Sequence, residues 1–131
     1  MGVDISLHIE IQINGRWEHY GQAPPFRDYA LFSLMACGWS CEPIVEPRGL
    51  PDDMNAVTRV AYDQEQTGYR ASWLTSHEVA ELVRRYTDQI EVKKPFWSTD
   101  YFGYLFFSES WTEVELPEGA TDFRFVFWFD N

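Results

Sequence analysis

Residues 3–13 alternate between apolar and polar side chains without a break, and this pattern constrains the fold more than any other stretch. The apolar set is Val3, Ile5, Leu7, Ile9, Ile11 and Ile13, and the polar set is Asp4, Ser6, His8, Glu10 and Gln12. A sustained period of two predicts a half-buried β-strand. Asn14-Gly15 is a favoured two-residue hairpin turn, so residues 16–20 should return as a second strand.

The other end of the chain predicts another long strand, and the stretches between the two ends predict helices. Phe123, Phe125, Phe127 and Phe129 alternate with Arg124, Val126 and Trp128. Apolar groups on both faces are typical of a central strand. Helical spacing occurs at 27–38 and 55–65, and again after Thr75, which forms a capping box with Glu78. Residues 90–116 show no clear period and are expected to be loop with two short strands at most.

These elements predict an α+β fold for a single domain spanning residues 1–131, in which an antiparallel sheet has two or three helices packed on one face. A chain with 45% hydrophobic and 18% aromatic residues can bury one sizeable core. Trp97, Tyr101 and Phe102 lie in the aperiodic aromatic segment. If these side chains are exposed, they indicate a surface for homo-oligomer formation.

The net charge of −11, from 21 acids and 10 bases, limits the classes of partner. Direct binding to a nucleic-acid backbone needs a basic patch and is disfavoured. Two classes remain, a small anionic ligand held by a few arginines and a basic protein surface attracted by the acidic field. No stretch of about 18 apolar residues occurs, so no membrane span is expected. No signal-peptide pattern is present, which predicts a cytoplasmic protein.

No motif for catalysis or cofactor binding is present in the sequence. Nucleophile elbows, glycine-rich phosphate loops and metal-ligand spacings are absent. His8 and Glu10 stand about 7 Å apart on one face of the first strand, and we interpret that face as solvated. The alternative is a small metal-dependent hydrolase that uses His8, Glu10, Asp52 or Asp53. The sequence therefore predicts no catalytic residue, no metal site and no cofactor.

The segment 42–53, EPIVEPRGLPDD, is the first candidate for a binding loop. Its prolines, at four-residue spacing, exclude a regular helix and lower the entropy cost of presenting a side chain. Arg48 carries the guanidinium that recognises phosphates and carboxylates, and Gly49 lets the backbone turn. The alternative is that Arg48 pairs with Glu46 or Asp52 and only holds the loop.

Two other segments supply residues for the same ligand site. Residues 69–75 are interpreted as a loop that enters a helix N-terminus, where free N–H groups and the helix dipole suit an anion. Arg27 and Tyr29 flank the start of the first helix. The alternatives are an ordinary loop before a capped helix and an ion pair between Arg27 and Asp28. The predicted ligand-binding residues are Arg27, Tyr29, Glu46, Arg48, Gly49, Tyr69, Arg70 and Trp73.

Five short segments, taken in order, resemble a group of small uncharacterised proteins of phages and prophages. The segments are MGVDISLHIE, RDYALFSLMA, EPRGLPDD, SWLTSHE and FVFWFDN, which match that group's Met-Gly-x-Asp-Ile strand, Arg-x-Tyr-x-Leu-Phe helix, EPRGLP loop, Ser-Trp-Leu-Thr helix start and Phe-Asp-Asn C-terminus. The group often has Cys and His where this chain has Val3 and Ser6, so this chain lacks any metal or nucleophile chemistry that this pair would supply. The resemblance implies no particular activity, because the group is uncharacterised, but it implies a phage context in an infected or lysogenic host cell.

The leading hypothesis is a non-enzymatic phage accessory protein that counters host defence by binding a small anionic, nucleotide-derived signal. Arginines would take the phosphate charge, and Tyr29, Tyr69 and Trp73 would stack on a base. The alternative is an acidic inhibitor that binds a host defence protein directly.

Overall fold

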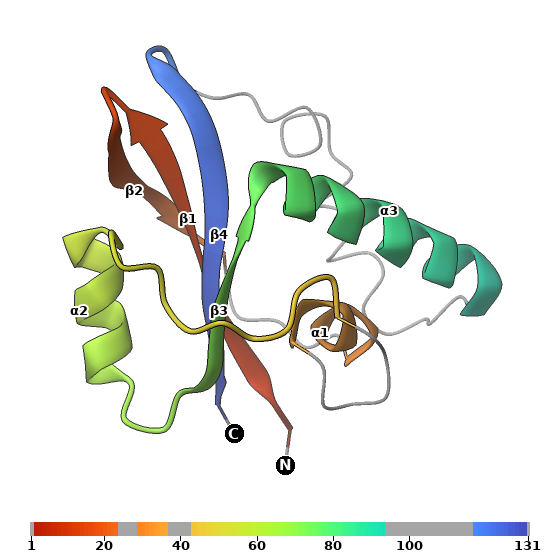
Figure 1. Ribbon diagram of the computed structural model, residues 1–131. Coiled ribbons are helices and arrows are strands. Elements are labelled where there is room, and N and C mark those ends of the chain that lie inside the picture. Colours follow the sequence, from red (N-terminus) through yellow and green to blue (C-terminus); the bar gives the residue numbers. More distant parts are fainter. Residues whose placement is uncertain (1, 24–28, 37–42, 94–116, 131) are drawn as a thin grey trace.

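The computed structural model describes residues 2–23, 29–36, 43–93 and 117–130. The strands are β1 (Asp4–Ile13), β2 (Arg16–Gln22), β3 (Tyr69–Thr75) and β4 (Ala120–Asp130), and the helices are α1 (Tyr29–Ala36), α2 (Ala56–Gln64) and α3 (Ser76–Lys93). Within these residues the strands form one antiparallel sheet in the order β2-β1-β4-β3 (Figure 1). The predicted α+β class with an antiparallel sheet is confirmed.

The two strands with the clearest sequence patterns, β1 and β4, are the central strands of the sheet. The turn between β1 and β2 has φ of 52° at Asn14 and 75° at Gly15, as a two-residue hairpin requires. β4 pairs along the length of β1, with Asp4 opposite Asp130. The central position predicted for residues 122–131 is therefore confirmed for the described residues 122–130, and the start of β1 lies beside the end of β4 (Figure 1).

The two faces of the sheet are covered by different helices. α1 and α3 pack on the face that carries the isoleucines of β1 and the phenylalanines of β4, as predicted (Figure 1). This layer is the apolar core, and its largest fully buried side chains are Leu31, Phe32, Met35, Leu74, Leu82, Tyr86, Phe127 and Phe129. α2 lies on the opposite face of the sheet (Figure 1).

The polar face of β1 is buried at its centre, so its interpretation as a solvated face is wrong there. His8 and Glu10 are almost inaccessible. Thr58 of α2 donates its hydroxyl to Glu10, and Tyr62 of α2 meets Trp128 edge-on with ring centroids 5.0 Å apart. The alternation of side chains assigns residues to two faces, but it does not reveal what covers the second face.

Residues 69–75 form the edge strand β3, so their interpretation as a loop is wrong. β3 pairs antiparallel with β4, with Leu74 opposite Phe125. The register shifts between Tyr69 and Ser72, and Arg70 has a positive φ of 53°. This irregularity breaks the period-two pattern that reveals the other strands.

The predicted capping box is present where β3 passes directly into α3. The Thr75 backbone N–H donates to Glu78 Oε1 at 2.8 Å, and the Glu78 backbone N–H donates to Thr75 Oγ1 at 3.2 Å. These reciprocal bonds satisfy donors at the helix start that would otherwise lack partners. The same donors are consequently not open to an anionic ligand.

Candidate functional site

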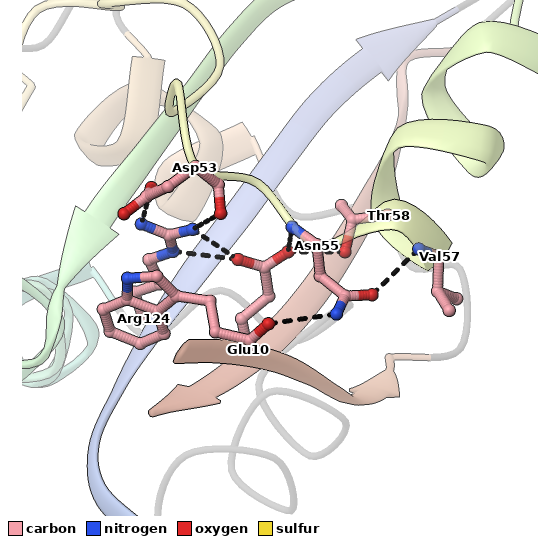
Figure 2. Close-up of polar contacts among 7 residues, drawn as sticks. Glu10, Asp53, Asn55, Val57, Thr58 and Arg124 are labelled. Carbon is pink, nitrogen blue, oxygen red and sulfur yellow. Dashed lines mark hydrogen bonds and ion pairs between the residues drawn. The ribbon is translucent and has the colours of Figure 1, made fainter. Parts of the chain in front are cut away.

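A buried ion pair between the two central strands lies on the face of the sheet that α2 covers. Glu10 of β1 and Arg124 of β4 are directly opposite in the sheet, and their side chains are 0% and 3% exposed. Arg124 donates to Glu10 Oε1 from Nε at 2.9 Å and from Nη2 at 2.7 Å (Figure 2). Two charges this deeply buried are tolerated because they are paired and hydrogen-bonded.

The second oxygen of Glu10 holds the beginning of α2. Glu10 Oε2 accepts the Asn55 backbone N–H at 3.0 Å and the Thr58 hydroxyl at 2.7 Å (Figure 2). Asn55 is the N-cap of α2: its side-chain oxygen accepts the Val57 N–H, and its amide nitrogen donates to the Trp17 carbonyl. Both carboxylate oxygens are thus engaged in joining β1, β4 and α2.

Asp53 is the outward member of this ionic cluster. Its side chain is 67% exposed and accepts a hydrogen bond from Arg124 Nη1 at 2.8 Å (Figure 2). The bond from Arg124 is the main cause that lowers the pKa of Asp53, and the side chain of Trp17 adds a weaker hydrogen bond. The Trp17 ring also lies 4.0 Å from the Arg124 guanidinium. Arg124 is therefore enclosed by groups of this chain, and the part of the cluster that solvent reaches is the Asp53 carboxylate.

Arg48 is held within the chain as well, by an acid other than the predicted Glu46 or Asp52. Its Nη2 donates to Glu78 Oε1 at 2.6 Å and to the Trp73 carbonyl at 2.8 Å. The guanidinium also stacks on the Trp73 ring, 3.8 Å from its centroid. Arg48 therefore fastens its loop to the junction of β3 and α3, which agrees with the loop-holding alternative.

The loop around Arg48 also runs along the outer edge of β3. The Gly49 N–H donates to the Ala71 carbonyl at 2.9 Å, and the Arg48 N–H donates to the Ser72 hydroxyl at 3.3 Å. Gly49 has a φ of 79°, which favours glycine. The structure thus brings together Arg48, Gly49 and Trp73 from the predicted ligand site, and it uses them to cover an edge strand.

Two other predicted ligand residues, Tyr69 and Tyr29, contact different parts of the chain. Tyr69 packs beside the core, with its ring 6.4 Å from that of Phe129. The Tyr29 hydroxyl accepts the Val3 backbone N–H at 3.0 Å, near the start of β1. Glu46 and Arg70 are exposed. Arg27 lies outside the described residues, as do Trp97, Tyr101 and Phe102.

A second buried polar group surrounds His8, and the sequence did not predict its contacts with His19 and Trp128. Its ring stacks on Trp128 with centroids 5.0 Å apart, and its Nδ1 lies 3.0 Å from Nε2 of His19. Burial and, after it, the nearby His19 lower the pKa of His8 to about 4, although Glu10 acts in the opposite direction. His8 is therefore neutral at pH 7. In the described part of the chain, no three His, Cys, Asp or Glu residues are placed to hold a metal ion.

Removing the Arg48 side chain tests its loop-holding role. We expect Arg48→Ala to lower the free energy of unfolding by about 1 kcal/mol, because the Arg48 side chain is 30% exposed and solvent screens its ion pair with Glu78. The Gly49 amide should exchange faster with solvent once the loop loosens. Chemical denaturation and amide hydrogen exchange measure both effects. Arg59→Ala, at an exposed position on α2, is the matched control and should change neither.

Comparison of the chain with protein-family models, with curated proteins and with solved structures finds no match. Among the described residues, no helix is both long enough and apolar enough to cross a membrane.

Proposed function

We propose that this protein acts by binding a basic surface of another protein. The observation that supports this proposal is that the arginines of the site already pair with acids of the same chain. Arg48 and Arg124 are bound by Glu78, Glu10 and Asp53 of the same chain. An added anion would have to displace these carboxylates, whereas a basic partner meets acids that are already exposed.

The charge that remains on the surface is negative. Arg84 and Arg85 of α3 pair with Glu81, which further reduces the free positive charge. Exposed acids occur on the loop that runs across the sheet and on the helix that follows it, and they are Glu46, Asp52, Asp53 and Asp63. With a net charge of −11, the whole chain attracts a basic surface at long range.

The resemblance to phage proteins supports a host defence protein as the partner class. Under this proposal the protein inhibits by occupying a basic surface, and it needs no reaction of its own. A nucleotide-derived signal is the alternative ligand, and it is supported by the partly exposed Arg48 that stacks on Trp73. That ligand would have to replace Glu78 at the guanidinium.

Salt dependence of partner capture tests the proposal. The immobilised protein should retain host proteins from a lysate at low salt and release them as salt rises, because the Debye length falls from about 10 Å at 0.1 M to about 3 Å at 1 M. A Glu46→Gln/Asp52→Asn/Asp63→Asn variant should capture less at every salt concentration. If the amount of captured protein changes neither with salt concentration nor with these substitutions, the proposal is contradicted.

The alternative ligand has its own diagnostic result. Thermal stabilisation of the protein by cyclic dinucleotides or ADP-ribose, abolished by Arg48→Ala, would favour the nucleotide-derived signal over the basic protein. We expect no such stabilisation, because Glu78 already neutralises Arg48 at 2.6 Å.

A further inference from the structure

α2 has the reverse of the usual orientation for a surface helix. Thr58 is its buried residue, whereas Val57 and Val60 are 56% and 54% exposed. A surface helix normally turns its valines towards the protein and its threonine towards water. Here the inner face is held by the Thr58 hydroxyl on Glu10 and by the Tyr62 ring on Trp128.

The outward side of α2 forms an uncharged strip. At about 3.6 residues per turn, Ala56, Val57, Val60 and Gln64 lie on one side of the helix. All of these residues are exposed. We call this set the valine strip.

Exposed acidic side chains stand close to the valine strip in the sequence. Asp52 and Asp53 precede the N-cap of α2, and Asp63 lies in its last turn; all of them are exposed. Arg59 is the one base in the sequence of the helix. The local charge is therefore negative, with an apolar centre and an acidic rim.

We infer that the valine strip docks an amphipathic segment of the basic partner, with apolar side chains over Val57 and Val60 and Lys or Arg side chains against Asp52 and Asp63. This inference rests on the proposed function and names the surface that performs it. Apolar side chains at the centre of an interface and charged side chains at its rim are the usual arrangement in protein complexes. A second copy of the chain fits poorly, because each copy carries a net charge of −11.

The buried cluster makes this surface ready for binding. The Asn55 cap and the Glu10 hydrogen bonds hold the N-terminal turn of α2 against the sheet before any partner arrives. A helix that is already fixed loses less conformational entropy on binding than a mobile one. The buried Glu10–Arg124 pair thus positions α2 with its valines outward.

The test uses the full chain and a synthetic amphipathic helical peptide of leucine and lysine. Calorimetry measures its affinity, and amide chemical shifts locate its binding site. We expect the shifts to concentrate at residues 52–64, and Val57→Asp/Val60→Asp to weaken binding by about tenfold or more. The substitutions add negative charge, so attraction by charge alone predicts tighter binding instead. Gln22→Asp/Ala80→Asp, at exposed positions on β2 and α3, adds the same charge elsewhere and should not weaken binding.

Other outcomes overturn the inference. Equal binding of a scrambled leucine–lysine peptide, or undiminished binding by Val57→Asp/Val60→Asp, would show that the valine strip is not the docking surface. Equal binding of a leucine–glutamate helix would show that the partner is not basic. Sedimentation that reveals a dimer abolished by Val57→Asp/Val60→Asp would assign the strip to a second copy. Failure of the leucine–lysine peptide to bind anywhere would count against the proposed function itself.

Discussion

Replacing Glu10 by alanine is expected to lower the free energy of unfolding by about 3–5 kcal/mol. The substitution removes the carboxylate that accepts two hydrogen bonds from Arg124, one from Asn55 and one from Thr58. Arg124 is 3% exposed, so bulk water cannot accept the hydrogen bonds of its guanidinium in place of the Glu10 carboxylate. The remaining acid, Asp53, is bound through a different nitrogen and lies at the surface.

Denaturant unfolding of matched variants measures this effect. Glu46→Ala removes an exposed acid and should change the free energy of unfolding by less than about 0.5 kcal/mol. Thr58→Val keeps the shape of the helix contact but removes one hydrogen bond to Glu10. Its loss of free energy of unfolding should therefore lie between the losses from Glu46→Ala and Glu10→Ala. A loss from Glu10→Ala as small as that from Glu46→Ala would mean that the ion pair does not hold the α2 side of the sheet.

Acidification from pH 7 to pH 4 is expected to lower the free energy of unfolding by about 3 kcal/mol through His8 alone. The pKa of His8 is about 4 in the folded protein, against 6.5 for an ordinary histidine. Between these two pH values the unfolded chain binds a proton that the folded chain does not bind. The contribution is therefore fully present above about pH 6.5, is lost as the pH falls, and is exhausted near pH 4.

Variants separate His8 from the other titrating groups. His8→Phe keeps a ring against Trp128 and should flatten the pH dependence of the free energy of unfolding between pH 6.5 and pH 4. Gln66→Ala, at an exposed position that carries no titrating group, should leave that dependence unchanged. An unaltered slope in His8→Phe would place the acid sensitivity in other groups. Asp53 acts mainly below this range, because its contribution is lost as the pH falls through the ordinary aspartate range towards its lowered folded pKa.

The candidate site was only partly visible in the sequence. The proline spacing identifies the loop around Arg48, but it does not decide whether Arg48 binds a ligand or an internal acid. The internal acid proved to be Glu78, which lies 30 residues further along the chain. Arg124 and Glu10, the centre of the buried cluster, are 114 residues apart and were not connected by any motif. Only the register between β1 and β4 places them opposite one another.

The sequence by itself determined the features that depend on residues close together in the chain. These features are the alternation of β1 and β4, the Asn14-Gly15 turn and the capping box of Thr75 and Glu78. Each results from backbone geometry and hydrogen bonds within a few residues, so short patterns reveal it.

The tertiary structure alone decided which faces and edges of the sheet are covered. α2 buries the polar face of β1, the Arg48 loop covers β3, and Val57 and Val60 are left outward on α2. These outcomes depend on packing between segments that are distant in the chain. A polar face can be buried only where its charges find partners, and for Glu10 that partner is supplied by the last strand.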